Sequence, residues 1–232
     1  MLTSQTLPSD QTMKLIHNTV LSLVMLIFAH SLMALESVSS PDGNIVFSVS
    51  NNDKHWLVYS VTFNDEIVLA ESRLGLRFKN QKGLDAGLEI QQVERLNSDQ
   101  TWEQPWGERR LVRDHHNEML IHLQDDTQRR LDLRVRVFND GLGFRYEVPK
   151  QTGLQRLDIV DELTEFHLPE DSWAWWIPGR AYNRYEYLYQ QTGLDAIQLA
   201  HTPLTLKTPS GVHLSIHEAA LVDYAAYVLD QR

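Results

Sequence analysis

Apolar and polar residues alternate along much of the chain between residues 44 and 148. The segments 44–50 (NIVFSVS) and 56–64 (WLVYSVTFN) place apolar side chains at about every second position, and the polar run NNDKH separates them. A period of two is typical of β-strands, and the polar run predicts a turn between them. Further strands are expected at residues 66–71, 73–79, 87–96 and 118–124.

Two hairpins are predicted more sharply than the other strands. In the segment 129–148 (RRLDLRVRVFNDGLGFRYEV) the alternation stops at Asn139-Asp140-Gly141 and then resumes. These are the residues that supply left-handed backbone in a hairpin turn. Near the end of the chain, residues 204–208 and 212–217 flank Pro209-Ser210-Gly211, which predicts a second hairpin.

Helical periodicity is weak throughout, and residues 219–229 (AALVDYAAYVL) are the best candidate for a helix. Many short strands separated by turns favour an all-β fold. We therefore predict a large two-sheet β-sandwich in which each sheet buries one face against the other. The apolar stretch that follows the last strong strand leads us to expect that the domain is truncated at its C-terminal end.

The first 34 residues differ from the rest. From Met13, the expected start, a short basic region with Lys14 and His17 precedes an apolar run and then small residues. This order is typical of a secretory signal peptide. We expect residues 1–34 to be an upstream extension plus signal peptide, and residues 35–232 to be one exported domain that has no membrane segment after cleavage.

Composition excludes several classes of function. The formal net charge of −10 argues against a nucleic-acid partner, which would favour a basic surface. The chain has no cysteine, so disulfides, thiolate zinc sites and cysteine nucleophiles are excluded.

An aromatic block at residues 172–189 (SWAWWIPGRAYNRYEYLY) is the most unusual stretch of the sequence. Trp173 and Trp175, at strand spacing, are expected to face one way into a core. After them, aromatic rings are interleaved with planar polar groups. Such a surface suits a sugar, but it equally suits a domain interface with a polar rim. The ligand-contact candidates are Asn183, Arg184, Tyr185, Glu186 and Tyr187.

Other chemical motifs are sparse. The sequence His217-Glu218-Ala-Ala-Leu lacks the second histidine of a zinc-protease motif. Glu218 could offer one carboxylate to calcium, or it could be satisfied by neighbouring backbone or arginine. Residues 114–118 (DHHNE) are read as a strand edge, because neighbouring side chains point to opposite faces and cannot all converge on a metal. The carboxylates of residues 161–165 (DELTE) cannot be placed on a cleft from the sequence.

Several motifs, taken in order, resemble the N-terminal domain of glycoside hydrolase family 97. They are SPDGNIVFSVS, PWGERRLVRDHHNE, RVRVFNDGLGFRYEVP, DELTEFHLPEDSWAWWIP, NRYEYLY and TPLTLKTPSGVHLSIHEAALVDYA. The family comprises bacterial, largely periplasmic α-glucosidases and α-galactosidases. The resemblance implies a β-super-sandwich, of the galactose-mutarotase-like type, that packs on a (β/α)8 barrel lying outside this chain.

The same resemblance implies roles for particular residues. Glu218 matches the position at which the N-terminal domain supplies one ligand to a calcium ion that is shared with the barrel. No catalytic residue of the family has a counterpart in this chain, so an α-linked oligosaccharide would contact it only through the pocket wall. A free-standing carbohydrate-binding β-sandwich is the alternative. A mutarotase-like enzyme is a weaker one, because His217 and Glu218 make a poor acid–base pair.

Overall fold

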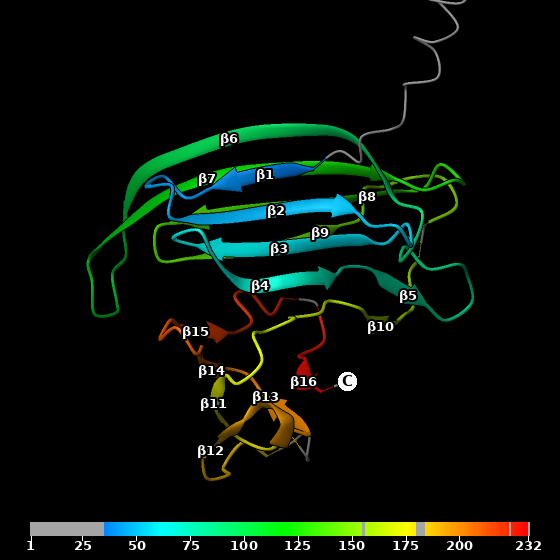
Figure 1. Cartoon of the computed structure of the whole chain (residues 1–232). Coiled ribbons are helices and arrows are strands. Elements are labelled where there is room, and N and C mark those ends of the chain that lie inside the picture. Colours follow the sequence, from blue (N-terminus) through cyan, green and yellow to red (C-terminus); the bar gives the residue numbers. More distant parts are fainter. Residues whose placement is uncertain (1–34, 155, 180–183, 223, 232) are drawn as a thin grey trace, which may run out of the picture. The chain divides into compact units, whose positions relative to one another are not determined.

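The first of two large sheets is formed by the N-terminal strands. The computed structural model describes residues 35–154, 156–179, 184–222 and 224–231. Strands β1 (Glu36–Ser39), β2 (Ile45–Asn51), β3 (Leu57–Phe63) and β4 (Glu66–Arg73) pair antiparallel in chain order (Figure 1). A two-residue turn joins β3 to β4, and its residues Asn64 and Asp65 have φ of 51° and 65°. Asparagine and aspartate tolerate this left-handed backbone, which matches the twist of a hairpin.

The second large sheet has the order β6-β7-β8-β9. Its strands are β6 (Glu89–Glu103), β7 (Leu111–Gln124), β8 (Arg130–Phe138) and β9 (Gly141–Glu147). The β8–β9 hairpin predicted from the alternation is confirmed, with Phe138 opposite Gly141. The prediction of left-handed backbone at Asn139-Asp140-Gly141 is wrong, because none of these three residues has a positive φ.

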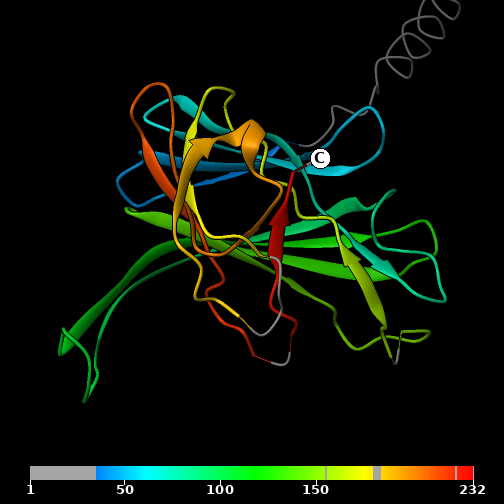
Figure 2. The same cartoon turned by 90° about the horizontal axis from the view of Figure 1, so that it is seen from below.

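The two sheets lie face to face as layers, which Figure 2 shows from below. Their facing side chains make one core, with Phe47 and Tyr59 on the first sheet and Leu133 and Val135 on the second all fully buried or nearly so. Tyr59 stacks on Phe47 with ring centroids 5.3 Å apart, and Phe144 of β9 lies 5.3 Å from Tyr59. The rings therefore connect the two layers. We call this part, β1–β4 with β6–β9, the main sandwich.

A two-stranded arm extends from the second sheet. Strand β8 pairs with β7 only from Asn117 onward, whereas β6 pairs with β7 along its whole length to Leu111. The hairpin therefore continues beyond its neighbours and projects from the sandwich (Figures 1 and 2). The sequence predicted both strands, but it ended the first too early, at residue 96, and began the second too late, at residue 118. We call residues 98–116 the β6–β7 arm.

A smaller group of strands forms a C-terminal lobe with its own core. Strands β11 (Trp173–Trp176), β12 (Gln190–Gly193), β14 (Leu204–Lys207) and β15 (His213–Ile216) form a sheet of order β12-β11-β14-β15. Strand β13 (Leu199–His201) pairs with β16 (Val228–Asp230), and a 3₁₀ turn, η1 (Leu194–Ala196), lies between β12 and β13. The hairpin predicted around Pro209-Ser210-Gly211 is confirmed as β14–β15.

The predicted orientation of the tryptophans in β11 is wrong. Trp173 is 53% exposed and Trp175 is only partly buried, whereas Ala174 and Trp176 lie in the core of the lobe. Trp176 donates a hydrogen bond from Nε1 to Thr192 Oγ1 at 3.0 Å, which fixes the ring in that core. Alternation placed Trp173 and Trp175 on one face, but the partner strands decide which face is covered.

A connecting segment joins the lobe to the main sandwich. Strand β10 (Ile159–Glu162) pairs with the short β5 (Leu76–Phe78), and the chain then runs along β4. There Tyr59 donates its hydroxyl hydrogen to the carbonyl oxygen of Glu165 at 2.7 Å. Phe166 and Leu168 pack against the cores of both the sandwich and the lobe.

The described residues are almost all β and contain no α-helix. The prediction of an all-β sandwich is therefore confirmed, with the lobe as an addition. The helix candidate at residues 219–229 is wrong, because Leu221 and Val222 are exposed there and no apolar face is buried to stabilise a helix. Among the described residues, no helix has the length and apolarity needed to span a membrane. The predicted signal peptide and Met13 lie outside the described residues.

Candidate functional site

The aromatic block runs from β11 across the lobe to β12. After β11, Pro178 bridges to Ala200, and the amide of Gly179 donates to the carbonyl oxygen of Leu199 at 2.8 Å. A side chain at Gly179 would crowd Val228 and His201, since a Cβ there would lie 3.2 Å from Val228 Cγ1. This close approach holds the start of the block against β13. We call residues 184–189 the aromatic segment.

Tyr185 is the best positioned of the predicted ligand-contact residues. Its ring stacks on the imidazole of His201, with centroids 4.1 Å apart and planes inclined by 28°. His201 is buried, and neither of its ring nitrogens has a hydrogen-bond partner among the described residues. Tyr185 is nevertheless 51% exposed. An aromatic ring that is supported from below and half exposed can stack on a ligand ring.

The neighbouring candidates lie on the same segment. The Arg184 guanidinium lies 5.2 Å from the centroid of the Tyr187 ring, which is within cation–π range. The Tyr187 amide donates to the carbonyl oxygen of Tyr185 at 2.9 Å, so the backbone turns tightly between them. Glu186 is exposed. Asn183 lies outside the described residues. The structure therefore brings Arg184, Tyr185 and Tyr187 together, with Glu186 beside them.

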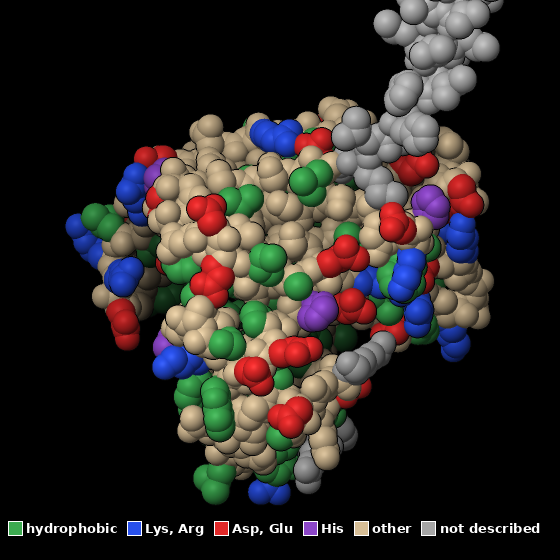
Figure 3. Space-filling model, viewed as in Figure 1, with side chains coloured by type: hydrophobic (Ala, Val, Ile, Leu, Met, Phe, Trp, Pro, Cys, Tyr) green, Lys and Arg blue, Asp and Glu red, His purple; other side chains and the backbone are tan. Residues whose placement is uncertain are grey.

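Apolar side chains remain on the surface of the lobe, as Figure 3 shows over the lower part of the molecule. Leu188 and Tyr189 of the aromatic segment are both well exposed. A contiguous apolar surface of this kind marks a contact with a ligand or with another part of a protein. The two readings of the aromatic block, sugar contact and domain interface, are both compatible with this exposure.

Glu218, the predicted calcium ligand, follows β15 and is half-buried. Its Oε1 accepts a hydrogen bond from the amide of Tyr227 at 2.6 Å. Burial, then the negative charges of Glu218 and Glu162, raise the pKa of Tyr227 to about 12. The hydrogen bond from the Tyr227 amide holds the Glu218 carboxylate in place. His217 beside it is exposed. Both residues lie beyond the end of β15, so the prediction that they lie on opposite faces of a strand is wrong.

The donor set around Glu218 tests the fit of a calcium ion. Among the described residues, no group of three or more His, Asp or Glu side chains is arranged to hold a metal. Calcium takes six to eight oxygen ligands. Glu218 could therefore supply at most one carboxylate to such an ion, and every further carboxylate would have to come from elsewhere.

Glu162 belongs to a polar chain that the sequence did not reveal. Its Oε2 accepts a hydrogen bond from the Tyr224 hydroxyl at 2.8 Å, and its Oε1 accepts one from Thr164 Oγ1 at 2.7 Å. Tyr146 continues the chain, because its hydroxyl lies 3.0 Å from Thr164 Oγ1 and accepts from the Gly75 amide. Burial, then the hydrogen bond to Glu162, raises the pKa of Tyr224. This series of hydrogen bonds connects the segment after β15 to the main sandwich.

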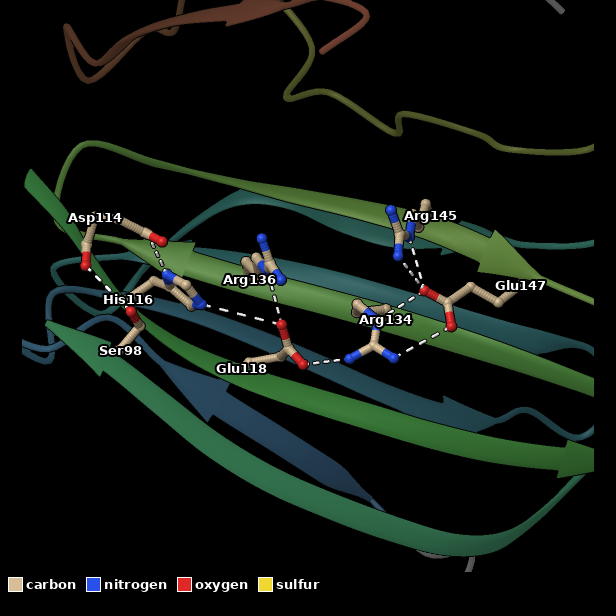
Figure 4. A network of polar contacts seen from close by, with 8 residues as sticks. All are labelled: Ser98, Asp114, His116, Glu118, Arg134, Arg136, Arg145 and Glu147. Atoms are coloured by element: carbon tan, nitrogen blue, oxygen red, sulfur yellow. Dashed lines mark hydrogen bonds and ion pairs between the residues drawn. The ribbon is translucent and has the colours of Figure 1, made fainter. Parts of the chain in front are cut away.

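Three of the residues 114–118 take part in a network of ion pairs (Figure 4). Asp114, His116 and Glu118 alternate along β7 and so share one face, with His116 Nδ1 2.6 Å from Asp114 Oδ1. Glu118 is 4% exposed and accepts hydrogen bonds from both Arg134 and Arg136. The strand-edge reading holds for Asp114 and His116, which have no β8 partner, but is wrong for Glu118, which lies between β6 and β8.

The network continues across the sheet. Arg134 donates to Glu147 on β9, with Nε 2.7 Å from Oε1, and Arg145 donates to the same oxygen at 2.7 Å. Hydrogen bonds from Arg134, opposed by burial, hold the pKa of Glu147 at about 2. Burial raises the pKa of Glu118, but its hydrogen bonds from Arg136 and Arg134 outweigh this and lower it. With its carboxylates ionised and paired, the network stabilises the sheet rather than forming an acid–base site.

Comparison with known protein families decides the relationship. The family model described as "Glycosyl-hydrolase 97 N-terminal" matches residues 38–232. The chain belongs to this family. A relative from Streptomyces bingchenggensis (strain BCW-1), described as a "Probable retaining alpha-galactosidase", is 30% identical in an alignment over 190 residues that covers 76% of this chain and 29% of the relative.

Solved structures of the family agree. A glycoside hydrolase family 97 enzyme from Pseudoalteromonas sp. strain K8, in complex with panose, has a TM-score of 0.82 and 45% identity over 85% of this chain and 30% of its own. The same enzyme with acarbose gives the same values. A β-arabinopyranosidase, at 22% identity and a TM-score of 0.68, shares the fold. This chain spans about 30% of the length of these relatives.

Proposed function

We propose that this chain is the non-catalytic N-terminal domain of an exported, calcium-dependent α-glycosidase of the α-glucosidase or α-galactosidase type. Its family membership supports this, together with relatives that are a retaining α-galactosidase by description and an enzyme bound to panose or acarbose. The catalytic carboxylates would lie in a (β/α)8 barrel, where such sites occupy the C-terminal face. The domain would pack on that barrel.

Within this function, the aromatic segment forms part of the pocket wall for an α-linked oligosaccharide. The observation that carries this step is the stack of Tyr185 on the buried His201, in which Tyr185 remains half exposed. Arg184 and Glu186 supply planar polar groups beside that ring. Sugars present apolar ring faces and hydroxyl edges, so a fixed ring with polar neighbours matches both.

Glu218 would supply one oxygen to a calcium ion that is otherwise held by the barrel. Bound there, calcium would fix the domain against the barrel and place positive charge near the pocket. The Tyr227 amide holds one oxygen of Glu218 and leaves the other for the ion. Residues 13–34 would act as the signal peptide, which would deliver the protein to the periplasm.

The coding DNA downstream of the Arg232 codon gives the first test. An open frame of at least roughly 250 residues, enough for a (β/α)8 barrel, is the expected result. The purified chain alone should not hydrolyse aryl α-glucosides or aryl α-galactosides above background. Turnover by the isolated chain would overturn the non-catalytic role.

The protein encoded by that frame then allows site-specific tests. Tyr185→Ala should raise KM for a maltooligosaccharide with little change in kcat, and Trp173→Ala, another exposed aromatic of the lobe, should leave both unchanged. Glu218→Gln should reduce the rise in Tm that calcium produces, without lowering Tm in chelator. An unchanged calcium response in Glu218→Gln would remove it from the calcium site.

The alternative is a free-standing carbohydrate-binding module, and the exposure of Tyr185 and Tyr189 favours it. A stop codon directly after Arg232 is its expected signature, together with binding of panose by the chain alone. That binding should be lost in Tyr185→Ala or Tyr187→Ala. A chain that binds no oligosaccharide would exclude the module.

A further inference from the structure

The tip of the β6–β7 arm presents apolar side chains that no described residue covers. Trp106 is 79% exposed, Trp102 is 51% exposed, and Leu111 is also exposed. Trp102 lies at the end of β6, opposite Val112 on β7, and Trp106 lies in the connecting loop. Grouped exposed apolar side chains mark interaction sites, and two exposed tryptophans lie within five residues here.

Polar contacts hold the arm in a defined shape although it has no core. Arg113 makes two hydrogen bonds to Asp99 across the strands, at 2.7 and 2.8 Å, and Arg110 pairs with Glu103 at 2.9 Å. Gln104 closes the loop, because its amide donates to the Arg110 carbonyl oxygen and its Nε2 donates to that of Arg109. Gly107 has a φ of 103°. The tryptophans are therefore displayed on a pre-organised loop, which lowers the entropy lost on binding.

We propose that the arm tip is a second carbohydrate-binding site, which stacks Trp102 and Trp106 on the sugar rings of an α-glucan chain. The two exposed indoles suit this ligand, because aromatic side chains stack on flat apolar faces. A sugar ring needs only one indole face. The proposal rests on the proposed function for the choice of α-linked glucan.

The charges at the tip agree with a neutral ligand. Glu103 and Glu108 balance Arg109 and Arg110. Such a balance offers no net attraction to nucleic acid or to an anionic membrane.

Affinity electrophoresis of the purified chain through gels containing soluble amylose tests the site. The wild type should be retarded, and Trp106→Ala should weaken the apparent affinity about tenfold, as expected for the loss of a central binding aromatic. Trp106→Phe should keep most of the retardation and Trp106→Leu should lose it, since the site needs a flat ring rather than an apolar side chain. Trp173→Ala, with 53% exposure in the lobe, is the matched control and should migrate as the wild type.

Three results would overturn the proposal: no retardation of the wild type, equal retardation of Trp106→Leu and Trp106→Phe, or retardation lost in Tyr185→Ala but kept in Trp106→Ala. Light scattering after gel filtration adds a fourth. A wild-type dimer that Trp106→Ala converts to a monomer would make the tip a contact between copies of the chain. The proposed function fails separately, through the KM effect of Tyr185→Ala, which Trp106→Ala should not reproduce.

Discussion

The main sandwich and the C-terminal lobe use the same antiparallel pairing but bury different amounts of apolar surface. The sandwich core contains fully buried residues from both sheets, such as Phe47 and Leu133. The core of the lobe has seven buried members, Ala174, Trp176, Ile197, Ala200, Leu204, Leu206 and Ile216. Because hydrophobic stabilisation scales with buried apolar area, the lobe depends far more on each of its core residues.

This difference also separates scaffold from site. In the sandwich, the buried carboxylate of Glu118 is paired with two arginines. The lobe instead leaves Tyr185 and Leu188 on its surface and buries His201 without a hydrogen-bond partner among the described residues. The large core and the exposed aromatic segment therefore lie in different parts of the chain, and substitutions can test how independent these parts are.

The largest expected effect is the loss of the lobe in Trp176→Ala. Removing a buried tryptophan costs about 3–5 kcal/mol, and the small lobe core cannot absorb it. Amides of β11 and β14 should lose protection from hydrogen exchange, while those of β7 and β8 keep theirs. Trp173→Ala is the control and should leave both patterns unchanged. Loss of protection in β7 as well would mean that the sandwich and the lobe unfold as one unit.

Glu118→Ala should be the strongest single charge substitution in the sandwich. It leaves Arg134 and Arg136 without their shared carboxylate, which costs on the order of 3 kcal/mol for a buried pair. Urea unfolding should report this as a lower midpoint with an unchanged slope. Asp99→Ala removes an exposed ion pair with Arg113 and should change stability little. Equal effects of the two substitutions would show that burial of Glu118 does not strengthen the network.

Tyr59→Phe probes the connection between the two regions. It removes the hydrogen bond to the Glu165 carbonyl oxygen and leaves the ring packing intact, so a loss of about 1 kcal/mol is expected. Exchange of the amides at residues 165–168 should accelerate more than that of β2. Leu133→Ala should instead destabilise the sandwich by about 3 kcal/mol without this local preference.

The sequence predicted the large sandwich because its strands alternate clearly and are long enough to reveal their period. The β8–β9 hairpin and the strand character of residues 44–64 follow directly from this pattern. The sequence could not predict which face of β11 is buried. That depends on β12 and β14, which pair with β11 but follow the aromatic block in the sequence. A four-residue strand alternates, but it carries no signal of which face is covered.

The candidate site shows the same limit. The interleaved rings and polar groups identified Arg184, Tyr185 and Tyr187, since local composition is visible in the sequence. The support that His201 gives to Tyr185 was not visible, because His201 is 16 positions away and lies in a three-residue strand. The ion pairs of Glu118 were missed for a related reason: the alternation separates Glu118 from Asn117, but only the register with β8 brings the two arginines to it.

The smallest expected effect is the pH dependence contributed by His122 on the outer face of the sandwich. Its Nε2 lies 3.0 Å from Glu94 Oε1 on β6, and its Nδ1 lies 2.9 Å from Asp132 Oδ1 on β8. Hydrogen bonds to Glu94 and then Asp132 raise the pKa of His122 in the folded chain, against the opposing effect of burial. These three residues and Arg130 line one cavity of about 470 Å³.

A raised pKa in the folded state means that folding favours the protonated imidazole. The contribution of His122 is therefore fully present below the unfolded pKa of about 6.5 and is lost as the pH rises through the higher folded pKa. The stability difference between wild type and His122→Gln should be largest near about pH 5.5 and should shrink toward alkaline pH. A difference for His122→Gln that grew with pH would mean that the neutral imidazole is the form bound between the two carboxylates.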